Sequence, residues 1–142
     1  MDVPDDFHPL LRSTAVAILS TIGPSGAPQA TPTWFLFDAG TVRFSLVEGR
    51  QKLVNLRRDP RVSVLVIDPA RPTYYVELRG RVTLVDDPDA ALERAVSTKY
   101  TGGWADGESP GTMRHAAAVD VERVTSQRGH GPRPPGPTTS AS

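Results

Sequence analysis

Residues 44–66 read FSLVEGRQKLVNLRRDPRVSVLV, and the changes of pattern within them decide the fold. The first residues alternate between apolar and polar side chains, which is typical of a half-buried strand ending at Val47. Gly49 then predicts a turn, followed by a helix of about two turns over 51–58. We expect its buried stripe to consist of Leu53, Val54 and Leu56. A proline ends the helix, and the apolar run that follows predicts a central strand.

Outside this stretch, period-two patterning bounded by Gly, Pro and Asp clusters predicts further strands. With the central strand they make six, at 13–22, 27–37, 41–47, 61–68, 73–87 and 112–126. Pro28 and Pro32 cannot donate ladder hydrogen bonds, so they indicate an edge, a bulge or a ligand-facing position. Gly80 indicates a bend in the long fifth strand.

Two more short helices are predicted, over 7–12 and 87–100, the second with Asp87 as its N-cap. Six strands with hairpin-length connections favour a mainly β fold, a six-stranded antiparallel barrel with two or three short helices. We expect one domain over residues 1–127 and a disordered tail over 128–142, because the tail is rich in proline and glycine and has no large apolar side chain.

Composition excludes several classes of protein. Sixteen acidic and sixteen basic residues balance, so no global field attracts nucleic acid or a membrane surface. No apolar run approaches a membrane span, and we expect a cytoplasmic protein. The absence of cysteine excludes thiolate zinc sites, and the three histidines lack metal-ligand spacing, so no metal site is predicted. Neither a Walker loop nor a Rossmann fingerprint occurs.

The basic cluster divides into two groups. Five of the sixteen Lys and Arg residues lie between Arg50 and Arg61. Arg57 and Arg58 lie in the last helical turn, where the helix dipole favours cations, and Arg61 is explained as a strand-edge cation. Arg50 and Lys52 lie at the opposite, positive end. They predict a phosphate or carboxylate site there, although exposed cations are also tolerated at many helix starts.

The runs ATPTWFLFDAGTVRFSLVE (30–48) and GRQKLVNLRRDPRVSVLV (49–66) resemble the pyridoxamine 5'-phosphate oxidase-like (PPOX class) split-barrel flavoproteins. The resemblance is greater to the branch that uses the deazaflavin coenzyme F420, and it covers roughly residues 8–126. It implies a homodimer of six-stranded split barrels with the cofactor between the subunits. It also implies an oxidoreductase that transfers a hydride from the reduced coenzyme to a small conjugated organic substrate.

The resemblance assigns cofactor-binding roles but no catalytic residue. It implies that the phosphate contacts Arg50 and Lys52, and that Asn55 either contacts the cofactor or ties its helix to a neighbouring loop. Around the ring it places Ser45, Val47, Pro32, Thr33 and Trp34, of which Trp34 has the alternative of a core or interface residue. The second subunit's contribution is expected from the loop over 100–115, with Trp104, Arg114 and His115 as candidates; His115 has the alternative of a solvated or hydrogen-bonded surface residue. In such enzymes the cofactor carries the chemistry.

Two departures from the family bear on the function, one on the substrate and one on the cofactor. The vitamin B6 oxidases end in a segment with Trp and Arg that this chain lacks, which argues against pyridoxine phosphate as substrate. The first strands also carry fewer basic residues than the FMN-binding branch, which favours coenzyme F420. The alternatives are an FMN-dependent split-barrel oxidoreductase and a non-catalytic module that binds a flavin or deazaflavin.

Overall fold

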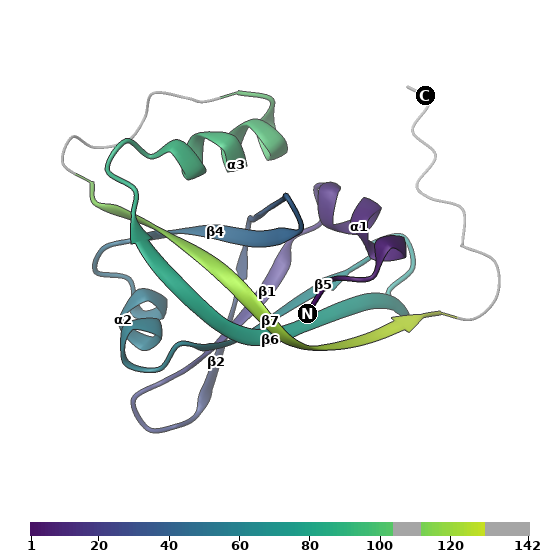
Figure 1. Cartoon of the computed structure of the whole chain (residues 1–142), viewed down its shortest axis with the longest axis horizontal. Helices are drawn as coiled ribbons and strands as arrows, with labels where there is room; N and C mark the ends of the chain where they lie inside the picture. The colour runs from purple at the N-terminus through teal and green to yellow at the C-terminus, as the bar shows by residue number, and fades with distance from the viewer. Residues whose placement is uncertain (104–111, 130–142) are drawn as a thin grey trace.

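The computed structural model describes residues 1–103 and 112–129 of the chain (Figure 1). Their strands form one antiparallel sheet in the order β2-β1-β5-β6-β7-β4-β3. The mainly β antiparallel architecture is therefore confirmed, with seven strands instead of six. In chain order the elements are η1 (Asp5–Phe7), α1 (His8–Arg12), β1 (Ala17–Ile22), β2 (Pro28–Thr33), β3 (Leu36–Asp38), β4 (Thr41–Val47), α2 (Gln51–Arg58), β5 (Arg61–Ile67), β6 (Tyr74–Asp86), α3 (Ala91–Thr101) and β7 (Arg114–Arg128).

The extra strand arises because the expected strand over 27–37 is interrupted at Trp34 and Phe35. Its first half, β2, pairs with β1, whereas its second half, β3, pairs with β4. These two halves are the opposite edges of the sheet. The Cα atoms of Thr33 and Leu36 are three peptide units apart, at most about 11 Å. The sheet must therefore curl until its edges approach one another, which produces a barrel.

The longest ladder joins β6 and β7, which run side by side as two curved ribbons in Figure 1. The register shifts between Arg79 and Gly80, as expected for the predicted bend. A Cβ atom on Gly80 would lie 1.9 Å from the carbonyl oxygen of Asp120. Only glycine permits this close approach of the two backbones.

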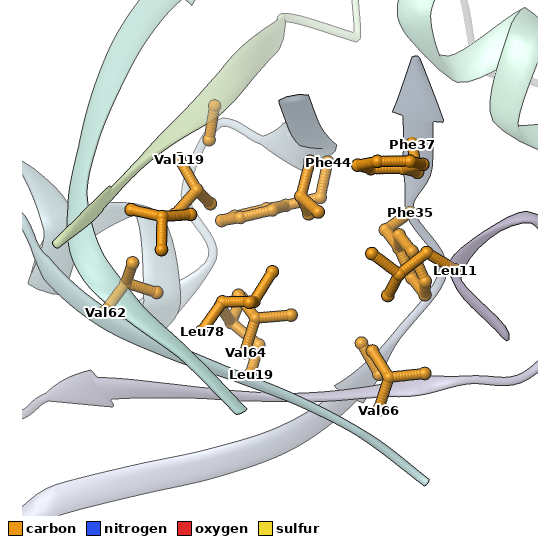
Figure 2. Close-up of a cluster of buried hydrophobic side chains, with 14 of the residues drawn as sticks. Leu11, Leu19, Phe35, Phe37, Phe44, Val62, Val64, Val66, Leu78 and Val119 are labelled. Carbon is orange, nitrogen blue, oxygen red and sulfur yellow. The ribbon is translucent and has the colours of Figure 1, made fainter. Parts of the chain in front are cut away.

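Side chains fill the interior of the barrel. Phe35, Phe44 and Leu78 are fully buried, and Figure 2 shows them pointing toward one another with side chains from α1, β1, β5 and β7. Because this core leaves no room for a ligand, a binding site must lie on the outside of the barrel. Among the described residues, no helix is long and apolar enough to cross a membrane.

Two helices differ in detail from expectation. In α2, Val54 is 46% exposed and Asn55 is fully buried, so the predicted apolar stripe is wrong at this position. Helix α3 begins at Ala91, not at 87, and its N-cap is Ala90. The Asp87 carboxylate nevertheless caps the helix, because it accepts hydrogen bonds from the backbone N–H groups of Ala91 and Leu92, each at 3.0 Å.

Candidate functional site

A pocket of about 420 Å³ lies where β2 ends. It is lined by the residue that precedes β1 and by residues at or near β2, β4 and α3, namely Val16, Pro32, Thr33, Trp34, Ser45, Glu93 and Val96. The predicted ring-binding residues of the β2 end and Ser45 of β4 are thus brought together. A slightly larger hollow, of about 480 Å³, lies by α1 and contains none of the predicted site residues.

Trp34 forms one wall of this pocket. Its ring stacks on Tyr100, with ring centroids 4.8 Å apart and an interplanar angle of 1°. The Tyr100 hydroxyl donates a hydrogen bond to the Ala15 carbonyl at 2.8 Å, which holds the stacked pair in place. Because Trp34 is 42% exposed, its indole is available to a ligand and is not a core residue.

The C-terminal half of α3 is anchored to the barrel by Lys99. Its ammonium group donates hydrogen bonds at 3.0 Å to the carbonyls of Leu11 and Phe35. It also lies 3.9 Å from the centroid of the Phe35 ring. Burial lowers the pKa of Lys99 to about 8. The helix that supplies Glu93 and Val96 is therefore fixed on the sheet.

Two polar residues of the pocket, Ser45 and Glu93, are joined by the Arg114 guanidinium. The Arg114 guanidinium is nearly buried; its Nη1 donates to the Ser45 hydroxyl at 3.3 Å and lies 3.4 Å from Glu93 Oε2. Sequence reasoning missed Glu93, although its i, i+3 spacing from Val96 places the two on one helix face. Arg114 was expected to serve a second subunit, yet it contacts Ser45 of its own chain.

The five clustered cations fall into the two groups that the sequence indicated. The Arg57 guanidinium donates two hydrogen bonds to the two carboxylate oxygens of Glu48, at 2.7 and 2.9 Å, and we call this contact the Arg57 fork. Arg58 donates to the Ile22 carbonyl at 2.7 Å, and Arg61 pairs with Asp59 at 2.7 Å. In contrast, the side chains of Arg50 and Lys52 make no hydrogen bond or ion pair with any residue in the described part of the chain.

The start of α2 has the electrostatics of an anion site. The Lys52 pKa is lowered, first by burial and then by the positive charge of Arg50. The helix has no side-chain N-cap, and its hydrogen-bond ladder begins with Leu53 and Val54, which both donate to the Arg50 carbonyl. The N–H groups of Gln51 and Lys52 precede this ladder. A bound anion would offset both the charge repulsion and the positive helix end.

Strand β4 connects the pocket to this anion site. Ser45 and Val47 are both half-buried and lie on the same face of the strand, about 6.6 Å apart along it. Ser45 lines the pocket, and the Val47 carbonyl accepts a hydrogen bond from Arg50 N at 3.2 Å. Gly49, with a φ of 89°, turns the chain between them and the helix. Along the chain, the predicted residues of β4 are thus followed directly by Arg50 and Lys52, and we call the stretch over 45–52 the strip along β4.

Both ends of the Asn55 side-chain amide form hydrogen bonds within the protein. Its Nδ2 donates to Thr21 Oγ1 and Gln29 Oε1, both at 3.0 Å, and its Oδ1 accepts from Gln51 Nε2 at 2.8 Å. These bonds support the alternative in which Asn55 ties α2 to its neighbours, here β1 and β2. A contact between Asn55 and a cofactor stays a prediction.

His115 lies away from the pocket, buried between two carboxylates. Its Nε2 is 2.6 Å from Glu48 Oε2 and its Nδ1 is 3.0 Å from Asp86 Oδ1. Trp104 and residues 130–142 of the predicted tail lie outside the described residues. Within the described ranges, no three His, Asp or Glu side chains gather as metal ligands.

Comparisons with known proteins show the family and the fold of the chain. A family model described as "Pyridoxamine 5'-phosphate oxidase" matches residues 3–128. A solved structure named "F420 Reductase" is 31% identical over 87% of this chain and 98% of its own, with a TM-score of 0.79. The conserved hypothetical protein Rv2991 of Mycobacterium tuberculosis is 29% identical over 89% of this chain and 86% of its own, with a TM-score of 0.74. HupZ of Group A Streptococcus, 18% identical over 91% of this chain and 99% of its own, has a TM-score of 0.65 and shares the fold alone.

Proposed function

The chain belongs to the pyridoxamine 5'-phosphate oxidase family, and from this premise we propose that it is an oxidoreductase that uses coenzyme F420. It transfers a hydride between the reduced deazaflavin and a small conjugated organic substrate. The observation that carries the proposal is the strip along β4. It begins at Ser45 in the aromatic-walled pocket and ends at Arg50 and Lys52, which have no ionic partner among the described residues; this order matches a ring joined by a chain to a phosphate. The 31% identity to a protein named F420 Reductase supports the choice of coenzyme.

The described residues fit the parts of this coenzyme. Pro32, Thr33 and the Trp34 indole border the ring. At the polar side of the pocket, the Glu93 carboxylate accepts hydrogen bonds while the Arg114 guanidinium and the Ser45 hydroxyl donate them. This combination suits the imide edge of a flavin or deazaflavin ring, in which an N–H lies between two carbonyls.

At the other end of the strip, Arg50 and Lys52 hold the phosphate, assisted by the backbone N–H groups at the start of α2. Val47 lies against the connecting chain between ring and phosphate. The bound reduced coenzyme supplies the hydride. The chain itself binds the coenzyme, orients the ring against the substrate and shields the pocket from water, and we propose that solvent protonates the product.

We also propose a cytoplasmic homodimer with the coenzyme at the subunit interface. In support, β1 and β5 place Ile18 and Leu65 opposite one another on the outer face of the sheet, both half-buried. Ile67 continues this apolar row on β5, and Ile18 also pairs with Pro32 of the pocket. Covering these side chains with a second copy would bury apolar area beside the coenzyme.

The decisive experiment is a titration of the purified protein with coenzyme F420 and separately with FMN. The chain has two tryptophans, so a Trp104→Phe background leaves Trp34 as the fluorescent reporter in the pocket. We expect submicromolar binding of F420 and weaker binding of FMN. Tight binding of FMN with none of F420 would make the protein an FMN-dependent split-barrel oxidoreductase instead.

A second measurement separates an enzyme from a binding module. The protein is mixed with reduced coenzyme F420 and a panel of quinones, enones and tetrapyrroles, and oxidation of the coenzyme is followed by absorbance. Turnover with at least one class supports the reductase and identifies the kind of substrate. If the coenzyme binds but is never oxidised, the non-catalytic binding module becomes the better description.

A further inference from the structure

One buried histidine joins three separate parts of the fold. His115, on β7, is only 4% exposed. Its Nε2 contacts the Glu48 carboxylate at 2.6 Å, from the turn between β4 and α2. Its Nδ1 contacts the Asp86 carboxylate at 3.0 Å, at the end of β6. No described residue of the pocket contacts this ring, so the proposed function leaves His115 unexplained.

Each ring nitrogen of His115 faces a carboxylate. A carboxylate oxygen only accepts hydrogen bonds, so a ring N–H is the donor in such a contact. Arg57 Nη2 lies 3.4 Å from the same Nε2, at the limit of hydrogen-bond length. The charged groups that contact the ring in the described chain are therefore Glu48, Asp86 and Arg57.

Glu48 transmits this arrangement to the anion site. It immediately precedes Gly49 and Arg50 in the chain. Its carboxylate is held by His115 and by the Arg57 fork, and its backbone N–H donates to the Met113 carbonyl at 2.9 Å. The Arg57 fork and the His115 contact lower the pKa of Glu48 to about 2, so it stays ionised at neutral pH. The turn that carries Arg50 is thus fastened through one carboxylate.

We propose that His115 is a positioning residue for the anion site: by binding Glu48 and Asp86 together, it holds the β4–α2 turn so that Arg50 and Lys52 face the coenzyme phosphate. This inference rests on the proposed function for the identity of the anion. Through this ring, the turn that carries Arg50 is linked to the end of β6 and to the start of β7.

Two substitutions of the same residue separate the Glu48 contact from simple burial. The amide nitrogen of glutamine takes the position of Nε2, so His115→Gln keeps a donor to Glu48. The amide nitrogen of asparagine takes the position of Nδ1, so His115→Asn keeps only the donor to Asp86. We expect His115→Asn to weaken F420 binding by about tenfold and His115→Gln by much less. His8→Asn, on α1 at the opposite side of the molecule from α2 in Figure 1, is the control and should change nothing.

The difference between the two variants is a readout that simple burial of the ring would not give, because both substitutions remove the same imidazole. Equal affinities of His115→Asn and wild type, or equal affinities of His115→Asn and His115→Gln, would overturn the proposal.

Hydrogen exchange of the peptide spanning 46–56 tests the positioning role without any coenzyme. Faster exchange in His115→Asn than in His115→Gln, with thermal unfolding showing both variants folded, supports the inference even if F420 does not bind. Unchanged exchange in both variants overturns it even if F420 binds tightly. Failure of the proposed function, in which wild type binds neither F420 nor FMN, is thereby distinguished from failure of this inference.

Discussion

At the scale of a single residue, Arg50 and Lys52 differ from Arg61 in their ionic partners, because the Asp59 carboxylate already neutralises Arg61. We therefore expect Arg50→Ala and Lys52→Ala each to weaken F420 binding by about 1.5–3 kcal/mol, the value of a hydrogen bond to a charged group. Arg61→Ala is the matched control and should leave the dissociation constant unchanged. Fluorescence titration at two salt concentrations measures the effect. An unchanged affinity in the Arg50/Lys52 double variant would remove both residues from the site.

Asn55 lies beside the candidate site, and its hydrogen bonds tie α2 to β1 and β2. Asn55→Ala leaves the buried hydroxyl of Thr21 and the amide of Gln29 without their hydrogen-bond partner. We expect a loss of about 1–3 kcal/mol in the free energy of unfolding, measured by urea denaturation. The neighbouring Val54→Ala, at a half-exposed position, should cost no more than about 0.5 kcal/mol. Equal effects of the two substitutions would contradict this role.

At the scale of an element, the β6–β7 ladder depends on the missing side chain of Gly80. A Cβ atom there would overlap the Asp120 carbonyl, and both partners are backbone, so neither can move away cheaply. We expect Gly80→Ala to destabilise the protein by about 1–3 kcal/mol or more. Gly103→Ala is the control, because a Cβ at Gly103 meets nothing within 4 Å. A melting temperature for Gly80→Ala equal to that of the control would contradict the prediction.

Helix α2 could be predicted from sequence to the residue, because a glycine and a proline bound it locally. The break between β2 and β3 could not, because it depends on which strand each half finds as a partner. The same limit explains the error at Val54. Helical periodicity identifies an apolar face of α2. Only the fold shows that Thr21 and Gln29 pack against this helix and accept hydrogen bonds from the Asn55 amide.

In the candidate site too, some residues could be predicted from local sequence signals and others depend on the fold. Arg50 and Lys52 were found because both conflict with the dipole of their own helix, which is a local signal. Pro32 and Ser45 were assigned only through a family resemblance. The Glu93–Arg114 pair joins α3 to the start of β7, and no spacing in the sequence indicates that these two side chains meet.

At the scale of the whole molecule, two exposed ion pairs contribute to the response of stability to acid. Hydrogen bonds from Arg57 and then His115 lower the pKa of Glu48 to about 2, and hydrogen bonds from Arg61 lower that of Asp59 to about 2. In the unfolded chain these groups titrate near 4.3 and 3.9. Their contribution is thus present above about pH 4.5 and is lost as pH falls toward about 2.

The prediction is a free energy of unfolding that decreases over this acidic window. Urea denaturation at a series of pH values measures it. Glu48→Gln should flatten the decrease, because the variant has no carboxylate to protonate. Asp2→Asn is the control, since the Asp2 carboxylate forms no ion pair with a described residue. If the slope in Glu48→Gln equals that of wild type, Glu48 does not contribute to acid sensitivity.

The two edges of the sheet have a consequence for behaviour at high concentration. One edge, β2, carries Pro28 and Pro32, and the other, β3, has only three residues. Proline offers no N–H to an incoming strand, and so short a strand offers little length for pairing. Neither edge is therefore a good template for adding strands of other molecules. We therefore expect little strand-to-strand association between molecules at high concentration.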